Sequence, residues 1–170
     1  MKRSGRTLKQ RLYGLKHLSS RIKRARHFRG HGVHSPYVYD IVRKVFMQSK
    51  LVSERHDLYA ALREHDIAER RCVQLQNLVA HCRYEAWTID NMEECHFIVC
   101  TLDTTFDRLQ AYVDYAREHK LTLCIMDPYN NAQRWDVCRT IVAEHRPTTV
   151  DNRAYLLVFN NHLPKQVFVL

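Results

Sequence analysis

The stretch WTIDNMEECHFIVC, residues 87–100, decides the fold class of this chain, because the hydrophobic pattern changes within it. Residues 87–89 and 97–100 are short runs rich in β-branched and aromatic side chains, which predicts two strands. The residues before them follow a helical pattern, with apolar side chains gathered on one side. The chain therefore changes here from helices to an alternation of strands and helices.

A helix and a buried strand are predicted directly after this stretch. The helix covers residues 104–119, with Thr104 as its N-cap and Asp107 at the third helical position, the arrangement of a capping box. The strand covers residues 121–126 and ends at Asp127. Strands separated by helices of this length are typical of layered α/β domains.

The C-terminal part continues the alternation and then closes it. Asn131 is a predicted cap for a helix that stops before Pro147. Residues 154–159 and 166–170 are predicted strands that pair about a turn at residues 160–164. The order predicts an α/β sheet that ends in an antiparallel hairpin.

Helices are predicted upstream of the sheet. Ser35 followed by Pro36 is a helix start, with serine as the N-cap and proline at the first helical position. A second helical stretch covers residues 53–83, and we expect it to break near His65 and Asp66.

The positive charge of the chain is concentrated at its start. The net charge is +9, yet residues 1–30 hold 11 Lys or Arg and no acid, and the remainder is slightly acidic. Between Leu8 and Ile22, leucines and an isoleucine recur at intervals of three and four residues, which predicts an amphipathic helix. Either this helix docks its leucines on the body, or it is an arm for nucleic acid or an anionic membrane surface. The predicted nucleic-acid contacts are Arg21, Lys23, Arg24, Arg26 and Arg29.

Glycine is confined to the same region. All four glycines lie within the first 32 residues, and the other 138 positions have none, where about ten would be usual. P-loops and dinucleotide-binding turns need two or three glycines so that the backbone can approach a phosphate. Neither motif exists downstream of Gly32.

Other classes of protein are also disfavoured. No run of about 18 apolar residues predicts a transmembrane helix, the first residues lack the apolar segment of a secretory signal, and we expect a cytoplasmic protein. The six cysteines include no C-x-x-C pair and most have apolar neighbours, which favours free buried thiols. Every serine lies in the N-terminal third, so a Ser-His-Asp hydrolase is not expected.

Four segments together resemble a known family. They are HGVHSPYVYDIV (31–42), RRCVQLQNL (70–78), CIMDPYNNAQRWDVCRTI (124–141) and AYLLVFNNHLPKQVFVL (154–170). These segments are similar to bacterial class I methyltransferase-like proteins that depend on S-adenosylmethionine and carry an HG-x-HSP segment. The resemblance implies a Rossmann-like sheet, a closing antiparallel hairpin and S-adenosylmethionine as the cofactor.

The sequence departs from that family at the cofactor turn. Class I methyltransferases place a glycine-rich turn after the first strand, whereas residues 90–96 here contain no glycine. Asp127 matches the first acid of the family's Asp-Asp pair, which ligates a divalent cation in metal-dependent relatives, but the second position is Pro128. Asp127 is therefore the candidate metal ligand, with a turn or helix-entry residue as the alternative. The family also has an acidic residue at the end of the preceding strand, which is residues 97–100 here; the acid in this sequence, Asp103, is displaced from that position.

These observations predict three regions and a function. Residues 1–30 form the basic arm, residues 31–83 the helical region, and residues 84–170 a truncated Rossmann-like half-sheet. Trp87 and Ile89 are expected at its cut edge, covered by the N-terminal helices or by a second copy of the chain. We predict a methyltransferase-like pseudoenzyme that has lost S-adenosylmethionine binding and acts as a non-catalytic binding or structural protein. The alternatives are a nucleic-acid-binding module that uses the arm, and an active methyltransferase with an atypical cofactor site.

Overall fold

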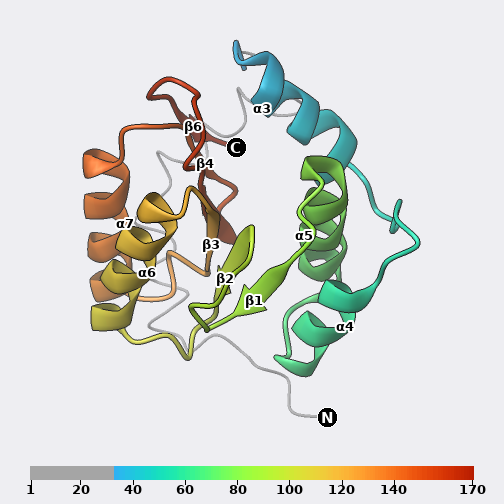
Figure 1. The fold of residues 1–170 in the computed structure, drawn as a ribbon, viewed down its shortest axis with the longest axis horizontal. Coiled ribbons are helices and arrows are strands. Elements are labelled where there is room, and N and C mark those ends of the chain that lie inside the picture. Colours follow the sequence, from blue (N-terminus) through green and yellow to red (C-terminus); the bar gives the residue numbers. More distant parts are fainter. Residues whose placement is uncertain (1–32) are drawn as a thin grey trace.

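The computed structural model describes residues 33–170, which form an α/β domain with helices on both faces of a single sheet (Figure 1). The predicted arm of residues 1–30, with its candidate nucleic-acid contacts Arg21, Lys23, Arg24, Arg26 and Arg29, lies outside the described residues. None of the helices within residues 33–170 combines the length and the apolar character needed to cross a membrane.

The helical region contains three α-helices and one π-helical turn. They are α3 (Pro36–Ile41), the π-helix η2 (Val42–Phe46), α4 (Asp57–Glu64) and α5 (Glu69–Cys82). Ser35 caps α3 through its hydroxyl, which accepts from the backbone N–H of Val38 at 3.4 Å, and Pro36 opens the helix as predicted. The break predicted near His65 and Asp66 is also confirmed, because the backbone of Asp66 has φ 55°, in the left-handed region that ends a helix.

The sheet has six strands in the order β1-β2-β3-β5-β4-β6. Their bounds are β1 (Trp87–Ile89), β2 (Phe97–Cys100), β3 (Thr122–Met126), β4 (Thr149–Asp151), β5 (Tyr155–Val158) and β6 (Val167–Val169). Strands β1, β2 and β3 are parallel to one another, and β5 is antiparallel to its neighbours β3 and β4. Strand β6 pairs with β4 in parallel.

The antiparallel hairpin at the C-terminal end is made by different strands from those expected. It joins β4 to β5, and the expected direct pairing of residues 154–159 with residues 166–170 is wrong, because β4 lies between them. Residues 152–154 make the turn, with Arg153 at φ 58°. Strand β4 was not predicted from the sequence: it has only three residues and ends in Asp151, and aspartate is depleted in strands.

Each face of the sheet carries its own core. On one face, Phe97, Val99 and Tyr155 pack with apolar residues of α3, η2, α4 and α5. On the other face, Ile98 and Ile125 pack with α6 (Phe106–Glu118) and α7 (Ala132–Glu144). Figure 1 shows these two groups of helices on opposite sides of the strands. Successive residues of a strand point to opposite faces, so the uniformly buried strands β2, β3 and β5 serve both cores.

The two helices on the second face begin with different caps. Asn131 caps α7 as predicted, since its side-chain oxygen accepts from the N–H of Arg134 at 2.8 Å. The capping box predicted at Thr104 is wrong: the N-cap of α6 is Thr105, which makes no side-chain capping bond. The hydroxyl of Thr104 donates instead to the carboxylate of Asp90, a partner that lies 14 positions away in the sequence.

Strand β1 lies at one edge of the sheet, where Trp87 and Ile89 were expected. Both side chains are half-buried and pack against the core beneath α4 and α5. The indole N–H of Trp87 donates to the carboxylate of Asp57 on α4 at 3.0 Å. The helical region therefore covers Trp87 and Ile89, the two side chains of this edge strand that face it.

Candidate functional site

The crevice at the carboxyl ends of β2 and β3 is the candidate functional site. It has a volume of about 830 Å³. Its walls come from the loop after β2 (101–103), the end of β3 and the loop after it (126, 127 and 130), and the turn between α4 and α5 (64–68), together with Arg71 and Ala154. Ligands of open α/β sheets bind outside the carboxyl ends of the strands, which is where this crevice lies.

The turn between α4 and α5 forms one wall of the crevice. Local backbone hydrogen bonds hold this turn in its conformation. The N–H of Asp66 donates to the carbonyl of Arg63 at 3.1 Å, and the N–H of Ile67 donates to the carbonyl of Leu62 at 3.3 Å. The exposed side chains of His65 and Asp66 follow from this reversal of the chain.

The charges around the crevice are mostly negative. Its walls carry the carboxylates of Glu64, Asp66, Asp103 and Asp127. Among the described residues, the one arginine on the walls is Arg71, whose pKa is lowered from its usual value mainly by burial. Arg71 also donates to the side-chain oxygen of Gln74 at 3.0 Å, which draws it toward the core. An excess of carboxylates over cations favours a positively charged ligand.

Asp90 joins the end of β1 to the loop after β2. Its carboxylate accepts hydrogen bonds from the N–H of Thr101 at 2.8 Å and from the hydroxyls of Thr101 and Thr104. Its backbone carbonyl accepts from the guanidinium of Arg108 at 3.3 Å. Asp90 has φ 51°, a conformation that aspartate tolerates better than most residues. The side chain is thus held in one orientation beside the mouth of the crevice.

Arg134 holds the carboxyl ends of β2 and β3 together through hydrogen bonds to their backbone. Its guanidinium is buried and donates to the carbonyls of Met126 at 3.1 Å, Thr101 at 2.8 Å and Thr104 at 3.4 Å. Burial lowers its pKa from the usual value. One side chain therefore satisfies the backbone at the ends of both β2 and β3.

The sequence-predicted metal ligand Asp127 lies in the wall of the crevice. It follows β3 directly, has φ 45°, and its N–H donates to the carbonyl of Ala154 at 2.8 Å. Within residues 33–170, however, the group whose ligand atoms come close together is His65, Asp90 and Asp103, all within 4.8 Å of one another. Asp127 does not belong to this group, and its role as a metal ligand stays a prediction.

Sequence reasoning missed the roles of Asp90, Arg134 and His65. Asp90 stands immediately after a strand, and such strand-end acids are a recognisable signal for sites in α/β sheets. Arg134 lies in the first turn of α7, where a positive charge opposes the helix dipole, so a cation there needs acceptors close by. His65 had no signal beyond its place in a helix break.

The cysteines are free and buried or half-buried, which confirms the interpretation from composition. Burial raises the pKa of all six thiols, that of Cys138 to about 12. Thiols with raised pKa values stay protonated near neutral pH and are poor nucleophiles. The cysteines therefore stabilise the core and do not supply a reactive group at the crevice.

Comparisons of this chain with protein-family models, with curated proteins and with solved structures gave no match. The relationship to methyltransferases therefore stays a prediction from sequence motifs.

Proposed function

We propose that this protein is a methyltransferase-like domain that has lost S-adenosylmethionine binding and binds another ligand, without catalysis, in the crevice at its strand ends. The observation that carries the proposal is the arrangement of Asp90 after β1. In class I methyltransferases, which the sequence resembles, this position belongs to the glycine-rich cofactor turn.

The passage after β1 leaves little room for such a turn. Residues 90–96 alone connect β1 to its parallel neighbour β2, with no helix between them. The carboxylate of Asp90 is bonded to Thr101 and Thr104 across the gap between the two strand ends. A cofactor turn approaches its ligand through bare backbone, which a bonded aspartate side chain prevents.

The rest of the crevice supports binding more than catalysis. The thiols near the sheet have raised pKa values, and the buried guanidinium of Arg134 is engaged with backbone carbonyls. Within residues 33–170, the ionisable side chains on the cavity walls are four carboxylates, an imidazole and one arginine. These groups suit the capture of a cation.

We expect S-adenosylmethionine to produce no binding heat and no thermal stabilisation. A bound cofactor at about 100 times its dissociation constant would add roughly 2.7 kcal/mol to the free energy of unfolding. For a chain of this size that corresponds to an increase in Tm of about 5–10 °C. Isothermal titration calorimetry and a thermal melt, each with S-adenosylmethionine and S-adenosylhomocysteine, provide the measurement. A micromolar dissociation constant for either compound would contradict the proposal and favour an active methyltransferase with an atypical site.

A nucleic-acid-binding role for the arm is the second candidate, supported by the 11 Lys or Arg within residues 1–30 and the absence of acids there. If six of these cations neutralise phosphates, a plot of the logarithm of the binding constant against the logarithm of salt concentration should have a slope of about −5. Reversing the charges of Arg21, Lys23, Arg24 and Arg26 should abolish binding to RNA or DNA, measured by fluorescence anisotropy over a salt series.

The competing role of the arm gives a different result. If the leucine stripe docks on the body, replacing Leu12 and Leu15 with alanine lowers stability, and no salt-dependent binding is found. That combination would reject the nucleic-acid role.

A further inference from the structure

We propose that His65, Asp90 and Asp103 form a divalent-metal site at the crevice, with Zn²⁺ as the preferred ion. The proposal names a ligand for the binding function above and rests on it. It differs from the site expected from the sequence, which was centred on Asp127.

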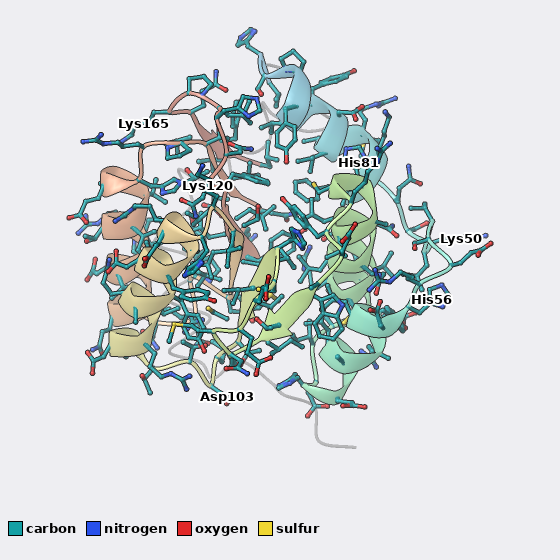
Figure 2. All side chains as sticks on the ribbon, viewed as in Figure 1. Lys50, His56, His81, Asp103, Lys120 and Lys165 are labelled. Carbon is teal, nitrogen blue, oxygen red and sulfur yellow. The ribbon has the colours of Figure 1, made fainter. Side chains whose placement is uncertain are left out.

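Three separate segments bring the ligands together. His65 belongs to the turn between α4 and α5, Asp90 follows β1, and Asp103 lies in the loop after β2. One ligand atom from each residue lies within 4.8 Å of the others. In a tetrahedral site, ligands at about 2.0–2.2 Å from Zn²⁺ are roughly 3.3–3.6 Å apart, so a closure of up to about 1.5 Å between ligand atoms is needed. His65 and Asp103 are exposed and free to make that adjustment, and Figure 2 shows Asp103 at the lower edge of the molecule in that view.

The donors define the class of ion. Imidazole nitrogen and carboxylate oxygen are both donors that Zn²⁺ accepts, and a set of three protein ligands leaves a position for water or another ligand. Imidazole favours Zn²⁺ over Mg²⁺ and Ca²⁺, which prefer oxygen donors alone. Two carboxylates also balance the charge of the ion.

Asp90 is the anchor of the site. Its bonds from Thr101 and Thr104 hold the carboxylate in place, as outer hydrogen bonds do for ligating carboxylates in metal proteins. Each carboxylate has about four acceptor positions, so these three bonds leave one for a metal ion. The neighbouring carboxylates of Glu64 and Asp66 add negative potential at the same mouth.

The test is Zn²⁺ binding by the full-length, metal-free protein, measured by competition with a chromophoric chelator and confirmed with Co²⁺ by visible absorption. We expect the substitutions His65→Ala and Asp103→Asn each to weaken Zn²⁺ binding by more than about 100-fold, the upper end for changes outside the ligand shell. Mg²⁺ should compete poorly.

Two matched variants serve as controls. His56→Ala removes an exposed histidine that lies outside the cluster (Figure 2), and Asp114→Asn removes an exposed carboxylate of α6 that lies outside both the cluster and the crevice. Each should change the Zn²⁺ affinity by less than about tenfold, since an exposed charge acts weakly through solvent. Circular dichroism of each variant is the check that it is folded.

Equal losses of Zn²⁺ affinity in the controls and in the ligand variants would overturn the proposal. Unchanged Zn²⁺ affinity in His65→Ala would also overturn it. So would the absence of Zn²⁺ binding by the unmodified protein at 100 μM, a concentration chosen for the assay. The result is independent of the cofactor titration. Failure of the metal site leaves the loss of S-adenosylmethionine binding intact, whereas cofactor binding would contradict the proposed function whatever the metal result.

Discussion

Replacing Arg134 with alanine is expected to lower the free energy of unfolding by about 3–5 kcal/mol, because three backbone carbonyls lose a charged donor and each hydrogen bond to a charged group contributes about 1.5–3 kcal/mol. The guanidinium donates to three carbonyls at the ends of β2 and β3, and those acceptors lose their donor in the variant. Each buried carbonyl left without a donor costs about 1–3 kcal/mol. Part of that total cost is offset, because the variant no longer has to bury the charged guanidinium. Urea denaturation followed by far-ultraviolet circular dichroism measures the change.

Two further substitutions show whether the loss comes from these bonds. Arg139→Ala, on the same helix, removes an exposed arginine that pairs with Asp136 at 3.2 Å, and we expect a change within about 0.5 kcal/mol. Arg134→Lys keeps the charge but has no planar fork to reach three carbonyls, so it should lose at least about 2 kcal/mol. A loss below about 1 kcal/mol in Arg134→Ala would show that water replaces the guanidinium and that Arg134 does not support the strand ends.

Replacing Tyr155 with alanine should cost about 3–5 kcal/mol, as for other large aromatic side chains in a core. Tyr155 is fully buried in β5 and makes an edge-to-face contact with Phe46, at 6.0 Å between ring centroids. Its hydroxyl accepts from the amide of Asn152 at 2.9 Å and donates to the side-chain oxygen of Gln74 at 3.2 Å. The side chain therefore ties the sheet to α5 and to η2. The same urea titration reports the loss.

The substitution Tyr155→Phe separates packing from hydrogen bonding. It keeps the ring and removes the hydroxyl, and we expect a loss of about 1–2 kcal/mol because Gln74 still accepts from Arg71. Tyr39→Ala, at a position 45 % exposed, should be nearly neutral. If Tyr155→Phe costs as much as Tyr155→Ala, the hydrogen bonds and not the ring hold this part of the core together. Typical domains have a stability of about 5–15 kcal/mol, so either alanine variant removes a large share of it.

Local patterns predicted most of the elements. The strands at residues 87–89 and 97–100, the helix break at His65 and the caps at Ser35 and Asn131 all agree with the structure. Each depends on neighbouring residues alone: a run of β-branched side chains, a serine before a proline, an asparagine before a helix. Such signals are present in the sequence because their physical causes act over one or two turns of the chain.

The pairing of strands depended on the tertiary structure. Residues 166–170 were expected beside residues 154–159, but β4 takes that place and pairs with both β5 and β6. Thr104 was expected to cap α6, yet its hydroxyl binds Asp90. In both cases a partner that is distant in the sequence, or that was not predicted, replaces the expected local partner. The neighbouring residues in the sequence do not indicate that partner.

The candidate site divides in the same way. The sequence by itself determined that no glycine-rich cofactor turn exists after Gly32 and that acids follow the strands, because composition and strand-end positions are local properties. Only the tertiary structure brought His65 of a helix turn to the acids at Asp90 and Asp103. The tertiary structure also brought the Arg134 side chain to the backbone carbonyls of Thr101 and Met126, at the ends of β2 and β3. Those arrangements arise from packing α4 and α5 on one face of the sheet and α7 on the other, which depends on burial and hydrogen bonding across the whole domain.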